Sequence, residues 1–542
     1  MNTKRLILLA VIIFITAGLY SQELESLVIL STNDVHGRIF PYNYYKDEPD
    51  EIGLAQVYTR VRQYRQEYDN VVLLDAGDAI QGTPLTQYFN FVKPDKPHPM
   101  SLAMNKMGYE AFAVGNHEIE QGTEVYNRIK NESDFPWLSA NSTLNDGSTY
   151  FKPYTVVNKN GISVGIIGLT TPGIPTMLDS TYYPGVTWTD MVLTAKKYAK
   201  ILRPSVDILV GLFHAGFRAG EDAYKSEKLG LPIANASGLV AEQVPEFDVV
   251  FGGHSHRIKP EIGTKTLETD KPLQIIARRW GECLGVAKFS LQNVNGDYKI
   301  INKMAWVEPV GGYEPDKELL QLLQPYHDKT LEYIRNDIAT VEDTIYGAES
   351  RFKDSPIVEL INNAQLEKTG ADISFAAGFR TNYVFAPGKL QIKDVFTIYP
   401  YENYLFMVKM SGKQIKDYLE ASANYYIFDG EKVMRNHEMA GYHYSMAEGI
   451  NYIIDPTKPV GKRISKITME ETGEPLKPNQ EYKVALNSYR ANGGGGLMKA
   501  AEAMDAPILY KSSQDMRNIL IDYLQKKGAI NARVDNNWRL LY

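Results

Sequence analysis

Residues 27–37, Leu-Val-Ile-Leu-Ser-Thr-Asn-Asp-Val-His-Gly, join a short apolar run to an Asp-x-His triplet. Runs of this length that are rich in Val, Ile and Leu are typical of buried strands. More runs of the same kind follow, and helical stretches such as 53–68 and 189–202 lie between them. This alternation predicts a layered α/β domain. The later runs are residues 71–74, 111–114, 163–169, 206–213 and 247–251.

Residues with metal-binding side chains directly follow five of these runs. In a layered α/β fold the loops at the carboxyl ends of strands meet at one edge, so these side chains are expected to lie together. Imidazole and carboxylate suit Zn²⁺, Mn²⁺ or Fe. Each motif alone is weak, because it also occurs by chance or in a hydrogen-bonded loop, but five in one domain favour a site for two divalent metal ions. The motifs are Asp34-Val-His36, Gly77-Asp78, Gly115-Asn116-His117-Glu118, Phe213-His214 and His254-Ser-His256.

The composition excludes several other kinds of protein. The 542 residues carry a formal net charge of −7, which argues against a protein that grips polymeric nucleic acid through a broad basic face. A single cysteine, Cys283, allows neither an intrachain disulfide nor a thiolate metal cluster. It precedes a strand-like run at 284–287, so a half-buried strand cysteine is favoured over a catalytic thiol.

The N-terminus predicts export. Lys4 and Arg5 precede an apolar run at 6–19, and Ser21 offers a small residue at a plausible cleavage point. The alternative is an uncleaved membrane anchor, but the run is shorter than the roughly 18 residues that a spanning helix prefers. We therefore expect a signal peptide over residues 1–21 and a mature protein in the periplasm, outside the cell or on its surface. No stable membrane insertion after cleavage and no obligate protein partner are expected.

The pattern changes near residue 315, which predicts two domains, as the length also favours. A first domain is expected over 25–311, a linking segment with a helix at 318–335 over 312–342, and a smaller α/β domain over 343–542. The second domain has its own helical stretches and apolar runs. They are residues 356–369, 411–425, 404–410, 450–454 and 482–487.

The order of motifs in the first half resembles the calcineurin-like metallophosphoesterase superfamily. The resemblance implies a domain of two β-sheets flanked by helices and two metal ions that bind phosphate oxygens and activate a water for attack on phosphorus. It also implies the ligands residue by residue. They are Asp34, His36 and His256 for one ion, Asn116, His214 and His254 for the other, and Asp78 as the bridge.

Three further acidic or imidazole residues have roles by the same resemblance. His117 matches the catalytic histidine, a general acid or stabiliser of the transition state rather than a ligand. Relatives often orient that histidine with an Asp, and here the candidate is Glu120, whose side chain is longer. Asp75, just before Ala-Gly-Asp, is expected to be structural and not a ligand.

The second half carries two loops of note, an aromatic one at 399–403 and one at 487–496 that ends in four glycines. A Tyr ring from each loop could sandwich a base, since stacking tolerates any base. With segments at 409–412, 418–423 and 447–452, these loops resemble the bacterial 5′-nucleotidase family, and most closely its 2′,3′-cyclic-nucleotide 2′-phosphodiesterase/3′-nucleotidase branch. The resemblance implies Tyr401 and Tyr489 as the stacking pair. The other predicted substrate contacts are Arg380, Asn403, Arg490 and Gly494.

The resulting expectation is a hydrolase of small-molecule nucleotides, acting outside the cytoplasm on 2′,3′-cyclic and 3′-nucleotides bound between the two domains. The same metal motifs would serve a 5′-nucleotidase or a UDP-sugar hydrolase. A polynucleotide nuclease is disfavoured by the acidic charge. A non-catalytic surface binding protein would be expected to have lost metal ligands, and here the set is complete.

Overall fold

The computed structural model of the chain describes residues 24–220, 230–268 and 270–541. The signal peptide expected over residues 1–21 lies outside the described residues. Within the described ranges, none of the helices combines the length and apolar character needed to cross a membrane. The described chain divides into two units, which consist mainly of the residues up to Thr330 and from Leu331 onward.

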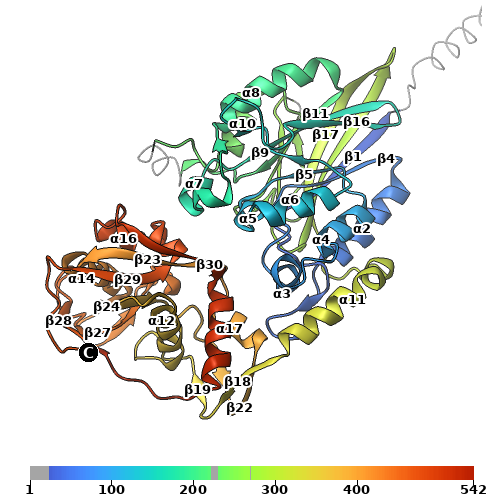
Figure 1. Cartoon of the computed structure of the whole chain (residues 1–542). Coiled ribbons are helices and arrows are strands. Elements are labelled where there is room, and N and C mark those ends of the chain that lie inside the picture. Colours follow the sequence, from blue (N-terminus) through green and yellow to red (C-terminus); the bar gives the residue numbers. More distant parts are fainter. Residues whose placement is uncertain (1–23, 221–229, 269, 542) are drawn as a thin grey trace, which may run out of the picture. The chain divides into compact units, whose positions relative to one another are not determined.

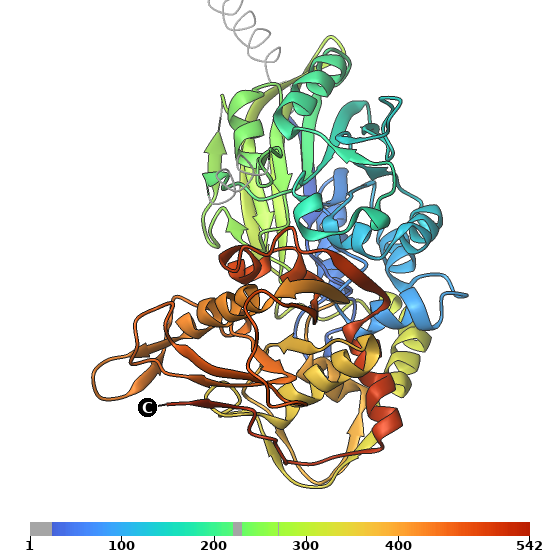
Figure 2. The same ribbon diagram turned by 60° about the vertical axis from the view of Figure 1, so that its left-hand side comes forward.

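The first unit is built on two β-sheets. The turned view of Figure 2 shows their longest strands, β16 and β17, side by side in yellow-green. The seven-stranded sheet has the order β14 (Thr266–Glu268), β17 (Asp297–Pro309), β16 (Cys283–Val294), β1 (Glu25–Thr32), β4 (Asn70–Asp75), β5 (Ala111–Ala113) and β6 (Trp137–Leu138). The six-stranded sheet has the order β13 (Ile258–Lys259), β15 (Leu273–Ala277), β12 (Val249–Gly252), β11 (Ile208–His214), β9 (Ile162–Thr170) and β8 (Tyr154–Lys159).

The two sheets pack face to face. One buried cluster contains Leu27 and Val72 of the first sheet together with Val210 and Val249 of the second. Helices α8 (Met191–Leu202) and α10 (Ser237–Gln243) cover the outer face of the second sheet, and α2 (Leu54–Glu67) packs against β4 of the first (Figure 1). Strands β1, β4, β5 and β6 run parallel, as do β9, β11, β12 and β15. Each parallel block therefore brings its carboxyl ends to one edge.

Cys283 is more deeply buried than the sequence suggested. It begins β16 with 3% of its surface exposed and belongs to the core between the sheets. Burial raises the pKa of its thiol to about 11, so the thiolate that a nucleophile needs is disfavoured near neutral pH.

The second unit has a smaller α/β arrangement around one core. Its helices α12 (Pro356–Thr369) and α17 (Met516–Lys527) pack together (Figure 1). Helix α13 (Ile392–Ile398) also contacts α17, and α14 (Gly412–Ser422) follows the strand at 404–411. The main sheet has the order β26 (Met446–Glu448), β20 (Ile373–Ala376), β29 (Glu481–Asn487), β23 (Tyr404–Ser411) and β30 (Ile508–Asp515). The two three-stranded sheets are β22 (Gly388–Gln391), β18 (Asp337–Val341) and β31 (Ala529–Ile530), and β28 (Ile464–Met469), β27 (Ile450–Ile454) and β32 (Trp538–Leu540).

Local signals explain where several helices begin and end. Ser411 caps α14, because its hydroxyl accepts from the Gln414 amide and the Gln414 side chain accepts from the Ser411 amide. Helix α12 ends at Gly370 in the left-handed conformation (φ 64°), which glycine adopts without strain. Helix α11 (Lys317–Ile334) matches the linking helix expected over 318–335, and residues 337–341 after it form β18, which pairs within the second unit.

Glu448, at the end of β26, makes the stability of the second unit depend on pH. Its side chain is 3% exposed, and burial, with the negative charges of Asp535, Glu359, Asp354 and Glu470, raises its pKa from 4.5 to about 10. Between these values the folded protein keeps a proton that the unfolded chain releases. The resulting stability is fully present below pH 4.5 and is lost as the pH rises toward 10.

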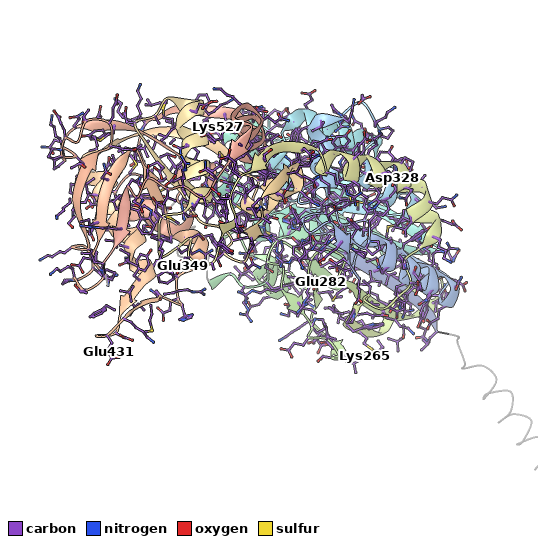
Figure 3. All side chains as sticks on the ribbon, turned by 90° about the horizontal axis from the view of Figure 1, so that it is seen from below. Lys265, Glu282, Asp328, Glu349, Glu431 and Lys527 are labelled. Carbon is purple, nitrogen blue, oxygen red and sulfur yellow. The ribbon has the colours of Figure 1, made fainter. Side chains whose placement is uncertain are left out.

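We therefore expect Glu448→Gln to remove this loss, because the amide oxygen can still accept from Asn537 Nδ2 (3.1 Å). Between about pH 6 and 8, the free energy of unfolding of the variant minus that of the wild type should increase by about 1 kcal/mol for each pH unit. Urea unfolding at several pH values measures this. Glu431, exposed and labelled in Figure 3, supplies the control Glu431→Gln, which should follow the wild type. Parallel pH profiles for wild type and Glu448→Gln would contradict the prediction.

Candidate metal centre

The seven predicted ligands lie just after strands of the first unit. Asp34 and His36 follow β1, Asp78 follows β4, and His214 is the last residue of β11. Asn116 opens the short helix α5 (Asn116–Glu120) after β5, and the loop after β12 carries His254 and His256.

The structure brings these side chains together in two groups. Asp34, His36 and His256 offer ligand atoms that lie within 4.8 Å of one another, and so do Asp78, His214 and His254. In the first group His36 Nε2 is 3.0 Å from His256 Nε2, which is 3.5 Å from Asp34 Oδ1. In the second, His214 Nε2 is 3.0 Å from Asp78 Oδ2 and 3.1 Å from Asn116 Oδ1. The nitrogen and oxygen atoms thus converge as ligands of a cation do.

Most of these residues have a backbone conformation that side chains other than glycine rarely adopt. Left-handed backbone of this kind is destabilising by roughly 1–3 kcal/mol per residue and persists where surrounding structure enforces it, often at functional sites. Here the left-handed backbone lets two side chains of one loop, two positions apart, lie in the same cluster, as with Asp34 and His36. The φ angles are 50° at Asp34, 50° at His36, 61° at Asp78, 67° at His254 and 54° at His256.

Two glycines make room for the cluster. A Cβ at Gly77, where φ is 94°, would lie 2.7 Å from both Ala113 O and His214 Nδ1. A Cβ at Gly115 would lie 2.1 Å from Asp78 Oδ1. Any larger residue at either position would displace a side chain of the cluster.

Glu118, which the sequence analysis did not single out, holds the Asp78 loop. Its fully buried carboxylate accepts from the amides of Asp78 (2.8 Å), Ala79 (2.7 Å) and Gly115 (2.8 Å). The position is the third residue of α5, where an acidic side chain commonly caps a helix start, and this local signal could have identified it. Asp75 is likewise structural in its contacts, because it accepts from Thr32 Oγ1 (2.5 Å) and from the Gly77 amide (2.8 Å).

The charges of the cluster suit a bound cation. Burial by itself would raise the pKa of Asp78, but the neighbouring His214, His117 and His36 hold it well below its usual range. Burial lowers the pKa of His36 and of His254 to about 4, so both rings are neutral near pH 7. His214 differs: burial by itself would lower its pKa, but the Asp78 carboxylate raises it to about 9, so this ring must release a proton when it binds a cation. Ionised carboxylates and neutral imidazoles are the forms in which these side chains bind metals. The donor set therefore fits two divalent ions of the Zn, Mn or Fe kind.

His117 lies beside the cluster and contacts Glu120. Its backbone amide donates to Asp78 Oδ1 (2.9 Å), and its Nδ1 is 2.5 Å from Glu120 Oε2. The ring centroid lies 5.3 Å from that of His36. The Glu120 side chain, although longer than an Asp, therefore reaches the His117 imidazole, and this contact can orient the ring. The catalytic roles of both residues stay predictions.

The second unit brings the two predicted stacking tyrosines into one aromatic group. Tyr401 and Tyr489 are 44% and 42% exposed. Two further rings connect them. The Tyr442 ring centroid is 5.9 Å from that of Tyr401, and His443 Nε2 is 3.2 Å from the Tyr489 hydroxyl. The sequence analysis missed Tyr442 and His443, because they are about 40 residues from either tyrosine.

The other predicted substrate contacts have different surroundings. Arg490 is 3% exposed, and its guanidinium donates to Gly494 O (3.0 Å) and Tyr442 O (2.5 Å), so it holds the two loops together. Asn403 is 8% exposed. Burial raises the pKa of the Tyr401 hydroxyl, and the positive charge of Arg380 opposes this, which places Arg380 near the aromatic group.

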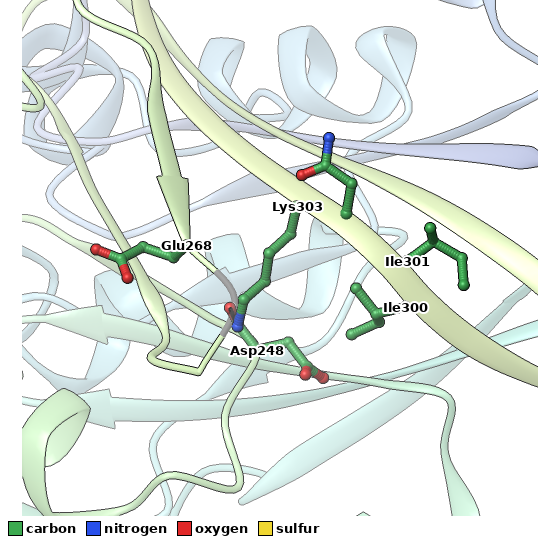
Figure 4. Close-up of a pocket in the computed structure, with 6 residues that line it drawn as sticks. Asp248, Glu268, Ile300, Ile301 and Lys303 are labelled. Atoms are coloured by element: carbon green, nitrogen blue, oxygen red, sulfur yellow. Dashed lines mark hydrogen bonds between the residues drawn. The ribbon is translucent and has the colours of Figure 1, made fainter.

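A separate cavity of about 110 Å³ lies at the amino end of β12, before the strand and not after it (Figure 4). Lys303 and Glu268 line it, and Lys303 Nζ donates to Asp248 O at 3.3 Å. Burial lowers the pKa of Lys303. The six residues that line this cavity include no histidine, so it does not compete with the strand-end cluster as a metal site.

Both halves of the chain match known families. Residues 27–257 match the family described as calcineurin-like phosphoesterase, and residues 337–502 match the 5′-nucleotidase C-terminal domain. The predicted fold class, a layered phosphoesterase domain followed by a smaller α/β domain, is confirmed.

Individual relatives extend over nearly the whole chain. The 2′,3′-cyclic-nucleotide 2′-phosphodiesterase/3′-nucleotidase of Yersinia enterocolitica is 28% identical over 98% of this chain and 91% of that protein. The trifunctional nucleotide phosphoesterase protein YfkN of Bacillus subtilis is 29% identical over 95% of this chain, which spans 39% of YfkN. The solved structure of a Staphylococcus aureus protein described as a 5′-nucleotidase has a TM-score of 0.78 at 24% identity, covering 95% of this chain and 100% of that one, and shows a shared fold.

Proposed function

Because the chain belongs to the family that joins a calcineurin-like metallophosphoesterase domain to a 5′-nucleotidase C-terminal domain, and is a hydrolase of that type, we propose that it hydrolyses 2′,3′-cyclic nucleotides and 3′-nucleotides. The observation that carries the proposal is the convergence of two Asp–His groups at the strand ends. The name of the Yersinia enterocolitica relative supports the choice of nucleotides.

In this proposal Asp34, His36 and His256 hold one ion, Asn116, His214 and His254 hold the other, and Asp78 lies between them. When bound, two such ions supply positive charge for the phosphate oxygens and lower the pKa of a water. Zn, Mn and Fe all suit the donor set, and the identity of the ions is part of what the experiment below must determine.

His117 is assigned the proton transfer to the leaving oxygen. Its Nδ1–H donates to Glu120 Oε2, which orients the ring. The Asp78 carboxylate accepts from the His117 amide and so ties the position of the catalytic ring to the ligand cluster.

Base recognition is assigned to the second unit. Tyr401 and Tyr489 expose ring surface in one aromatic group, and a base stacked on such rings gains roughly 1–3 kcal/mol. Arg380, near Tyr401, offers a positive charge to the substrate.

The nearest alternative is a 5′-nucleotidase or UDP-sugar hydrolase, which would use the same donor set. The fold shared with the Staphylococcus aureus protein keeps this alternative open. We further propose that the protein is exported to the periplasm or the cell surface, since Lys4, Arg5 and the apolar run at 6–19 have the form of a signal peptide.

The test is to purify the mature chain, measure its bound metals by elemental analysis, and compare rates on 2′,3′-cyclic AMP, 3′-AMP, 5′-AMP and a UDP-sugar. Faster hydrolysis of the first two supports the proposal. Equal rates on 3′-AMP and 5′-AMP would contradict the choice of substrate. Absence of both metal and hydrolysis would contradict the function as a whole.

Replacing the stacking rings is expected to weaken nucleotide binding alone. For Tyr401→Ala or Tyr489→Ala we expect KM for 3′-AMP to rise about 5- to 100-fold, the equivalent of one lost stacking contact. Hydrolysis of bis(p-nitrophenyl) phosphate, which has no base, should be unchanged. Tyr346, 66% exposed in the same unit, supplies the control Tyr346→Ala. Equal losses on both substrates would mean that the rings support the fold and not the base.

A further inference from the structure

Three residues that follow β15, Arg278, Arg279 and Glu282, line a cavity of about 390 Å³ together with His256 of the first ligand group. Arg279 Nη1 is 3.3 Å from His256 Nδ1, while the other ring nitrogen of His256 faces His36. One imidazole ring therefore separates the guanidinium of Arg279 from the converging donor atoms.

Three arginines surround this corner, and their partners differ. Arg38 pairs with Asp50 (3.0 Å), and Arg278 pairs with Glu282 (2.7 Å), which is labelled in Figure 3. Arg279 has no carboxylate partner among the described residues. Its guanidinium instead lies 4.0 Å from the centre of the Trp280 ring, which supports the planar group and leaves its N–H edge for other contacts.

The backbone holds Arg279 in place at some energetic cost. The residues on either side of it, Arg278 (φ 60°) and Trp280 (φ 61°), both have left-handed backbone. The Trp280 amide donates to Asp34 O (2.8 Å), and Asn33 Nδ2 donates to Arg278 O. Strained residues that are tied to ligand-bearing loops on both sides of one arginine are typical of a functional position.

The Arg279 guanidinium is placed to donate to His256 Nδ1, because a guanidinium carries donors and no acceptor. This contact uses one of its five N–H groups, so others can donate to an anion in the adjoining cavity.

We propose that Arg279 binds a phosphoryl oxygen of the substrate, and of the inorganic phosphate product, at the side of the centre formed by His256. The planar fork of two N–H groups matches a phosphate in geometry and charge. This inference deepens the phosphoesterase function proposed above and rests on it.

The test is binding of inorganic phosphate to the metal-loaded full-length mature chain, followed by calorimetry, with metal content measured in parallel. We expect Arg279→Ala to weaken phosphate binding about 10- to 100-fold, as loss of a charged hydrogen-bond donor does. Arg279→Lys should fall between this variant and wild type, because lysine keeps the charge without the fork. Arg62→Ala, a control on α2, should stay within about twofold of wild type, since Arg62 lies outside the cavity lining and pairs with Asp316 at 3.0 Å.

Three results would overturn the inference. They are wild-type phosphate affinity in Arg279→Ala, an equal loss in Arg62→Ala, and loss of metal in Arg279→Ala, which would mean that Arg279 acts through His256. A wild-type protein that binds phosphate through Arg279 but hydrolyses no nucleotide would contradict the proposed function and leave this inference standing.

Discussion

Asp78→Ala is expected to abolish hydrolysis and to remove both metal ions, because Asp78 is the ligand proposed to lie between them. Removing a residue that only supports metal ligands already lowers affinity or activity by about 10- to 100-fold, so loss of a shared ligand should exceed about 100-fold. The buried carboxylate lies 3.0 Å from His214 Nε2, at the meeting point of the donor atoms. Elemental analysis and kcat/KM on 3′-AMP measure the two effects.

Asp75, the last residue of β4 and three residues before Asp78, provides the matched control. Burial raises the pKa of its carboxyl well above the usual value, and Asp75→Asn keeps the shape and an oxygen that can still accept from the Gly77 amide. This variant should keep both metals and lose little activity. Two bound metals in Asp78→Ala, or metal loss in Asp75→Asn of the same size, would contradict the assignment of the bridging residue.

His117→Ala should keep both metals and lose about 10²- to 10⁴-fold in kcat on 3′-AMP, the usual contribution of a positioned general acid. The loss should be much smaller on bis(p-nitrophenyl) phosphate, because p-nitrophenolate leaves without protonation. Elemental analysis and steady-state kinetics on both substrates separate these effects.

Glu120→Gln tests the support of that histidine. The amide oxygen of Gln can still accept from His117 Nδ1, at the position where Glu120 Oε2 lies 2.5 Å away, but it lacks the negative charge of the carboxylate. We therefore expect a smaller loss of kcat than in His117→Ala. Loss of a metal in His117→Ala would show that His117 is a ligand. Equal losses on both phosphate esters would rule out proton transfer to the leaving oxygen as its role.

Much of the fold could be predicted from local patterns. The run at 27–30 became β1, the run at 450–454 became β27, and Ser411 and Gly370 mark helix ends through hydrogen bonds within a few residues. Such features depend on near neighbours in the chain, which a sequence displays directly. The sequence predicted a half-buried Cys283, and the structure buries it almost completely. The difference arises because the second sheet packs against β16, and most residues of that sheet are distant in the sequence.

The sequence by itself determined the two-domain α/β organisation, the family resemblance and the chemical identity of the donors, since each motif lies within a few residues of its strand. Only the tertiary structure decided which donors meet: His36 and His256 are 220 residues apart and lie 3.0 Å from each other. It also decided that Glu118 holds the Asp78 loop, that Tyr442 and His443 join the two tyrosines, and that Arg279 has no carboxylate partner among the described residues. The reason is physical, because these contacts join loops from separate strands, and only the packing and the left-handed turns at their ends set how the side chains meet.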